Sequence, residues 1–109
     1  MVTVTFCRDS QNRLSSVFAE GHAGWADPGQ DVVCAAASAI LQAAWLGLAE
    51  HAGIEVEGER TGGRLAMRWP AGARERADVR AIVATAELSI AQIARQFPDH
   101  VRAVRAKEP

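Results

Sequence analysis

The 109-residue sequence lacks the features that mark several protein classes. Its only cysteines are Cys7 and Cys34, whereas a secreted domain of this size often has a denser set of disulfides. Lysine and arginine total 12 against 13 for aspartate and glutamate, so the basic excess of a general nucleic-acid binder is missing. The N-terminus does not resemble a signal peptide, and the longest apolar run, from Val32 to Ala39, is shorter than the ~20 residues of a membrane span. We expect a reduced, cytoplasmic protein that binds neither nucleic acid nor membranes.

About half of the residues are apolar, which is typical of an ordered globular chain. Because the chain is short and has no repeat and no linker-like stretch, it predicts one domain over residues 1–109. Apolar and polar residues alternate from Met1 to Cys7, and a second strand is predicted from Arg13 to Glu20. Turn-forming residues at 9–12 indicate that the two strands form a hairpin.

A glycine-rich loop at residues 21–30 leads into a long predicted helix. Apolar residues at helical spacing place this helix from Asp31 to about Ala52. Asp31 is a suitable N-cap, and Gly53 lies where a helix commonly ends. The abundance of alanine favours both helix formation and close packing on a sheet.

The rest of the chain again predicts two strands and a helix. Residues 54–59 and 65–69 alternate as a second hairpin, and an apolar stripe indicates a helix from about Arg74 to Phe97. A short strand is predicted at 101–106. The order ββαββα(β) predicts an α+β fold with a single-layer, mostly antiparallel sheet and two helices packed on it. Three arginines are interpreted as a solvated helix start: Arg74, Arg76 and Arg80.

Cys34 is the candidate nucleophile. If Asp31 is the N-cap, Cys34 lies in the first helical turn, where free backbone N–H groups and the helix dipole favour a thiolate. The loop after His22 returns to the helix start and would bring the imidazole to the thiol. His22 can then accept the thiol proton and later protonate a leaving amine. The Cys34 N–H, with a neighbour from the loop, would stabilise an oxyanion.

Other residues nearby have candidate supporting roles. Ser38 lies one turn after Cys34 on the same helix face and can donate a hydrogen bond into the site. Asp31 either caps the helix or orients His22, and its charge would oppose thiolate formation. Trp25 either closes over a substrate or only anchors its loop, to which Gly21 and Gly29 give backbone freedom.

The residue types alone also permit plainer interpretations. A single cysteine in an apolar helix is more often a small buried hydrophobe, and a histidine at a strand end is more often structural. Cys7 is interpreted as an inert strand residue, and Trp45 and Trp69 as core or interface residues. The cysteines and histidines have no CxxC or HxxxH spacing, so we predict no metal site and no cofactor.

Two motifs around His22 and Cys34 resemble the hallmark of the ribosomal-processing cysteine protease family, Prp. The first is Gly-His-Ala at residues 21–23. The second is the run Gly-Gln-Asp-Val-Val-Cys-Ala-Ala-Ala-Ser-Ala at residues 29–39, in which Val32 replaces the usual isoleucine. The resemblance implies a cytoplasmic endopeptidase with a Cys34–His22 dyad, supporting roles for Asp31 and Ser38, and a homodimer.

The resemblance also implies a substrate, the N-terminal extension of a large-subunit ribosomal protein. Two alternatives stay open at this point. The first is a non-catalytic ribosome-associated module of the same fold, which would need an exposed basic or apolar patch instead of an activated thiol. The second is a small thiol hydrolase, which would need the same dyad.

Overall fold

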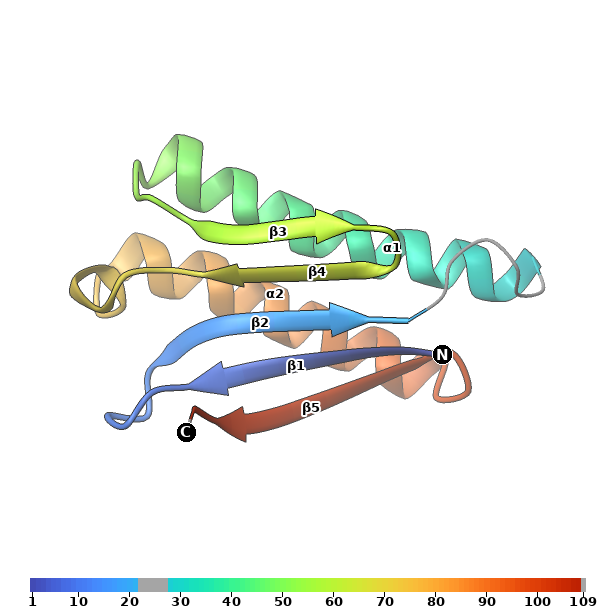
Figure 1. Ribbon diagram of the computed structural model, residues 1–109. Coiled ribbons are helices and arrows are strands. Elements are labelled where there is room, and N and C mark those ends of the chain that lie inside the picture. The colour runs from blue at the N-terminus through green and yellow to red at the C-terminus, as the bar shows by residue number, and fades with distance from the viewer. Residues whose placement is uncertain (22–27, 109) are drawn as a thin grey trace.

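A five-stranded mixed sheet covered on one face by two helices makes up the described part of the chain (Figure 1). The computed structural model describes residues 1–21 and 28–108, and for residues 28–31 it describes the backbone alone. The sheet has the order β3-β4-β2-β1-β5. Its strands are β1 (Val2–Arg8), β2 (Leu14–Glu20), β3 (Glu57–Thr61), β4 (Arg64–Arg68) and β5 (Val101–Lys107).

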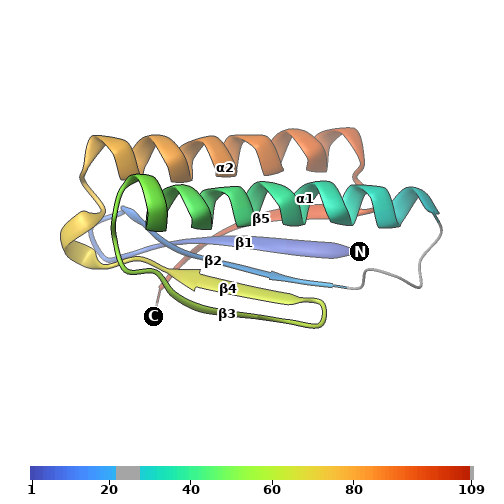
Figure 2. The ribbon, with the colours of Figure 1, turned by 90° about the horizontal axis from the view of Figure 1, so that it is seen from above.

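The two long helices, α1 (Pro28–Leu46) and α2 (Ala77–Gln96), lie side by side over the same face of the sheet, as Figure 2 shows. Neighbouring strands pair antiparallel except β1 and β5, which run parallel. The predicted α+β fold, with its mostly antiparallel sheet and the order ββαββα(β), is confirmed.

The core lies between the sheet and the helices. Alternate strand residues share a face, and helix residues three or four apart share a face, so β1, β2, β4 and the two long helices each contribute one apolar row. The sheet contributes Val4, Phe6, Val17, Ala19, Leu65 and Met67, and the helices contribute Val33, Ala37, Leu41, Ala44, Val79, Val83, Ala86 and Ile90. Trp69 is buried and Trp45 is packed against this core, as the sequence predicted.

Helix α1 begins three residues earlier than predicted, at Pro28. Proline suits the first helical position, since the N–H it lacks would have no intrahelical acceptor there. Asp31 therefore lies inside the helix, and its predicted position as the N-cap is wrong. At the other end, α1 continues into a π-helical turn (Gly47–His51), and Gly53 adopts a left-handed φ of 66°, as expected for a residue just beyond a helix.

The second hairpin begins later than predicted. β3 starts at Glu57 instead of Ile54, because Ile54 and Val56 pack against the core from the segment that joins the π-helical turn to β3. β4 ends at Arg68, one residue before the predicted end. The alternation of apolar residues at 54–56 therefore reflects burial of a connecting segment.

Helix α2 also begins later than predicted, at Ala77 instead of Arg74. A short 3₁₀ turn (Ala71–Ala73) precedes it, and Arg74 is only 6 % exposed. The interpretation of Arg74 as part of a solvated helix start is wrong, because its guanidinium donates to the Asp9 carboxylate at 3.0 Å and to the Trp69 carbonyl at 2.8 Å.

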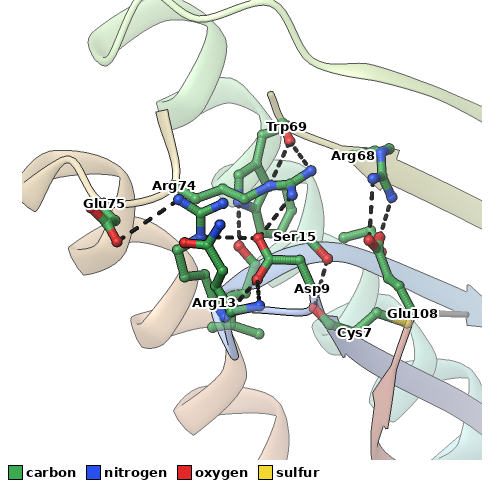
Figure 3. A network of polar contacts seen from close by, with 12 residues as sticks. Cys7, Asp9, Arg13, Ser15, Arg68, Trp69, Arg74, Glu75 and Glu108 are labelled. Atoms are coloured by element: carbon green, nitrogen blue, oxygen red, sulfur yellow. Dashed lines mark hydrogen bonds and ion pairs between the residues drawn. The ribbon is translucent and has the colours of Figure 1, made fainter. Parts of the chain in front are cut away.

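Asp9, in the turn between β1 and β2, is the centre of this polar corner (Figure 3). Its carboxylate accepts hydrogen bonds from the Gln11 and Arg13 backbone N–H groups and from the Arg13 and Arg74 side chains, at 2.9–3.0 Å. Burial opposes ionisation, but these four donors outweigh it and hold the pKa of Asp9 far below its ordinary value. The corner joins the first hairpin to the segment that precedes α2.

The segment Val32–His51, comprising most of α1 and the π-helical turn, is long and apolar enough to cross a membrane by length and composition only. Its mean hydropathy is 1.9. The sequence had predicted no segment of this kind, because that prediction considered only uninterrupted apolar runs. The core helix of a soluble protein passes the same test. Here 33 % of its most apolar 18-residue window is buried inside the protein.

Candidate active site

Cys34 and Ser38 line a pocket of about 360 Å³ between α1, the end of β2 and the turn that joins β3 to β4. The two residues are four positions apart on α1, so they lie on the same face of the helix. Apolar side chains from the core, including Ala37, Leu41 and Leu65, form part of the lining. Cys34 is 4 % exposed, and the pocket gives a reactant space beside its buried side chain.

Cys34 is the seventh residue of α1 and lies in its second turn. The prediction that it lies in the first turn is wrong, because the helix begins at Pro28. The free N–H groups of a helix belong to its first four residues, and the effect of the dipole falls off within the first turn. The predicted oxyanion role of the Cys34 N–H loses its basis, and the thiolate needs other stabilising groups.

The end of β2 is fixed against the β3–β4 turn by two glycines. The Gly21 N–H donates to the Gly63 carbonyl at 3.0 Å, and the two residues have φ angles of 151° and 79°. A Cβ atom on Gly21 would lie 2.4 Å from the Met1 carbonyl oxygen, and one on Gly63 would lie 2.6 Å from that of Gly21. Only glycine fits at either position. This contact places the residue before His22 at the wall of the pocket.

A hydrogen-bonded chain of side chains connects Ser38 to β3. The Gln42 amide lies 2.7 Å from Ser38 Oγ, and the Arg60 guanidinium donates to Gln42 Oε1. All three residues line the pocket. The sequence analysis missed Gln42 and Arg60. The spacing of four residues between Ser38 and Gln42 was a signal for the first contact, but Arg60 reaches Gln42 only through the packing of β3 beside α1.

Among the residues that the structure describes in the pocket lining, the remaining charged side chains are Glu20 at the end of β2 and Arg64 at the start of β4. The Arg64 guanidinium lies over the Phe18 ring, 5.2 Å from its centroid, which holds it by a cation–π contact. Among the side chains of residues 1–21 and 32–108, no three His, Cys, Asp or Glu residues are grouped so that they could hold a metal ion.

Comparison with known families places these residues in context. The model of the family described as cysteine protease Prp matches residues 1–102, which include the whole pocket. The chain belongs to this family. It is accordingly a cysteine peptidase. No curated protein matches the chain.

Solved structures share the fold of this Prp family member. Protein SMU.848 from Streptococcus mutans is 25 % identical, with a TM-score of 0.84 over 99 % of this chain and 96 % of that chain. An essential ribosomal processing protease Prp from S. aureus has been solved with a covalently linked product peptide and with a substrate peptide. These two structures are 22 % and 21 % identical, with TM-scores of 0.83 and 0.86 over 96 % of this chain and 99 % of each of theirs.

Described residues of both Prp motifs line the pocket from two sides. Gly21 directly follows β2 on one side, and Cys34 and Ser38 lie on α1 on the other. Gly29 and Asp31 lie in the first turn of α1, where the backbone alone is described. The prediction that Gly29 belongs to the loop is therefore wrong, because the helix begins at Pro28. The remaining two predicted residues, His22 and Trp25, lie outside the described residues, so the pairing of Cys34 with His22 stays a prediction.

Proposed function

We propose that this protein is an endopeptidase in which Cys34 is the nucleophile and His22 is its general base. Membership of a cysteine protease family requires a reactive cysteine, and Cys34 supports this role because it lines a pocket and belongs to the family motif. Cys7, the other cysteine, lies on β1 outside the lining of that pocket. His22 follows Gly21 directly, and Gly21 lines the same pocket.

The reaction follows from these assignments. His22 takes the thiol proton, and the Cys34 sulfur attacks the carbonyl carbon of the substrate peptide bond. The carbon–nitrogen bond breaks as His22 gives its proton to the leaving amine, which leaves an acyl group on the sulfur. Water, deprotonated by His22, then releases the acid and restores the thiol. Ser38 supports the nucleophile, and Asp31 has the remaining predicted role of orienting His22.

We propose the N-terminal extension of a large-subunit ribosomal protein as the substrate and the cytoplasm as the site of action. The S. aureus structures of the same fold support a peptide substrate, since one is a ribosomal processing protease solved with a substrate peptide. The loop that contains Trp25 would close over the peptide and exclude water from the thiolate.

The test mixes the purified protein with an extended ribosomal protein and follows the mass of the latter. Wild type should remove the extension, and Cys34→Ala should lose at least about 1,000-fold of the rate. Trp25→Ala should slow cleavage if the loop is a gate. Cleavage by Cys34→Ala would refute the nucleophile. A wild-type protein that binds the ribosomal protein without cleaving it would favour a non-catalytic module, and one that hydrolyses only small esters would favour a thiol hydrolase.

We also propose a homodimer that forms through the outer face of α1. Val32 and Leu46 on this helix are 69 % and 62 % exposed, and the residues between them on the same side are exposed alanines. An apolar depression lies beside them, lined by Ala39, Ala43, Trp45, Leu46 and Ala49 among others. Small residues let two helices approach closely, and burial of this apolar face stabilises a dimer.

A further inference from the structure

The side chains of Arg60, Gln42 and Ser38 form a chain of hydrogen bonds that leads from β3 into the pocket. Arg60 is exposed, whereas Gln42 and Ser38 are half-buried. This series of hydrogen bonds therefore runs from the solvent side of the hairpin to the helix face that carries Cys34. Its members come from two elements that approach each other only in the folded protein.

The chemistry of the three groups fixes the direction of each hydrogen bond. A guanidinium has donors only, so the Gln42 atom that faces Arg60 is the carbonyl oxygen Oε1. The amide nitrogen Nε2 therefore faces Ser38, and Ser38 Oγ is the acceptor at 2.7 Å. Since a lone pair of the hydroxyl oxygen is taken up in this way, its proton is directed to a different acceptor.

We propose that Arg60 and Gln42 are positioning residues that direct the Ser38 hydroxyl to donate a hydrogen bond to the Cys34 thiolate. This inference rests on the proposed function of Cys34 as the nucleophile and extends it. A hydroxyl donor beside a thiolate stabilises the charged form and increases the reactive fraction at neutral pH. Such a donor supplies the stabilisation that the second-turn position of Cys34 does not receive from the helix N-terminus.

Besides Arg60, the charged side chains that the structure describes in the pocket lining are Glu20 of β2 and Arg64 of β4, which carry opposite charges, and Arg64 is held over Phe18. On α1, the charge of Asp31 would oppose the thiolate equally in every variant below. Arg60 is engaged by Gln42, so its effect reaches Ser38 through the amide. From the loop, the proposed base His22 would act on the same thiol. It is unchanged in every variant below.

Gln42→Glu is the informative variant. The carboxylate keeps the size of the side chain and an acceptor for Arg60, but it has no donor for Ser38. The Ser38 hydroxyl must then donate to the carboxylate, so its proton turns away from Cys34. We expect iodoacetamide to label Cys34 about 10-fold more slowly at neutral pH, with the midpoint of the pH–rate profile raised by about one unit, as the loss of one hydrogen bond to a charged group predicts.

A double-variant cycle separates the hydrogen bond from the added negative charge. Ser38→Ala should slow labelling by a similar factor, and Gln42→Glu should add nothing in the Ser38→Ala background. Arg60→Met, at an exposed position, should slow labelling about 3-fold through the loosened amide. The matched control is Gln92→Glu, because the Gln92 amide oxygen also accepts from an arginine, Arg95, but on α2 away from the pocket. Cys7 provides the internal reference in every sample.

The outcomes are separable from those of the proposed function because labelling needs no substrate. If Gln42→Glu and Ser38→Ala slow labelling non-additively, the proposed orientation of Ser38 by Gln42 is supported even if no ribosomal protein is cleaved. An unchanged profile in Gln42→Glu, or an equal further slowing in the Ser38→Ala background, would overturn it even if cleavage occurs. The first of these is expected if the Ser38 hydroxyl only bonds back to the Cys34 carbonyl one turn earlier. If Cys34 of the wild type is labelled rapidly but the ribosomal protein is not cleaved, only the proposed substrate is contradicted.

Discussion

Asp9 is a nearly buried carboxylate whose four donors come from the hairpin turn and from Arg74, which precedes α2. Its lowered pKa links the stability of this corner to pH. A carboxylate with a depressed pKa in the folded state stabilises the fold at any pH above its unfolded value, about 3.9. That stabilisation decreases as the pH falls below this value towards the folded pKa.

We predict that Asp9→Asn lowers the midpoint of thermal unfolding at pH 7, because Arg74 keeps its burial but loses its anionic partner. The variant should also lose less stability than wild type between pH 5 and pH 2. The pKa values of Asp78 and Glu108 are also lowered, chiefly by hydrogen bonds from Arg76 and Arg68. Their contribution to the pH dependence of stability is the same in both proteins. Thermal melts across this pH range measure the difference.

Glu75→Gln is the control for this residue. Glu75 also faces Arg13, at 3.8 Å, but its side chain is 74 % exposed, and such ion pairs contribute little. The variant should follow the wild-type pH profile. An Asp9→Asn protein with the same melting curves as Glu75→Gln would contradict the role given to the Asp9 corner.

At the scale of elements, the close contact between the end of β2 and the β3–β4 turn positions the pocket wall. We predict that Gly63→Ala destabilises the protein by about 1–3 kcal/mol, because the side chain must either hold a φ of 79° or displace the Gly21 carbonyl. The rate of peptide cleavage should decrease by more than the unfolded fraction of the protein accounts for, since Gly21 directly precedes the proposed base. Urea denaturation and cleavage rates on the same samples test this.

Gly62→Ala is the matched control, because a Cβ atom on this neighbouring glycine would have no atom within 4 Å. It should leave both stability and cleavage near the wild-type values. Equal loss in the two variants would indicate that the turn as a whole, and not the approach of Gly21 to Gly63, sets the position of the wall.

The elements also show how far sequence patterns extend. Alternation and helical spacing predicted every long element, because burial on one face determines both patterns. The start of α1 was misplaced because Asp31 has the chemistry of a cap, whereas Pro28 is equally suited to open a helix. The motif identified Cys34 and Ser38 as pocket residues, but Gly63, Arg60 and the partner of Arg74 depend on contacts between segments distant in sequence, which no local pattern contains.

For the whole molecule, the proposed dimer can be tested on α1. We predict that wild type sediments at about twice 11.6 kDa at micromolar concentration and that Leu46→Glu shifts it to the monomer mass. A buried glutamate pair would repel across a symmetric interface. Analytical ultracentrifugation over a range of concentrations gives the dissociation constant.

The control for the dimer is Leu88→Glu on α2. Leu88 is 68 % exposed, so it matches Leu46 in exposure but lies on the other helix. Loss of the dimer in both variants would place the interface elsewhere. Co-sedimentation of wild type with lipid vesicles, abolished by Leu46→Glu, would instead assign the apolar face of α1 to a membrane.

The parallel pairing of β1 with β5 has a consequence for synthesis of the chain. β1 leaves the ribosome before the other strands, but the strand that completes its second edge follows about 100 residues later, where Val2 pairs with Val101. Until residues 101–107 emerge, β1 presents an open edge to other nascent chains, and closing so long a loop is slow. Val2 is also a wall of the pocket. This wall of the pocket therefore belongs to a strand whose second edge is covered only after residues 101–107 have been synthesised.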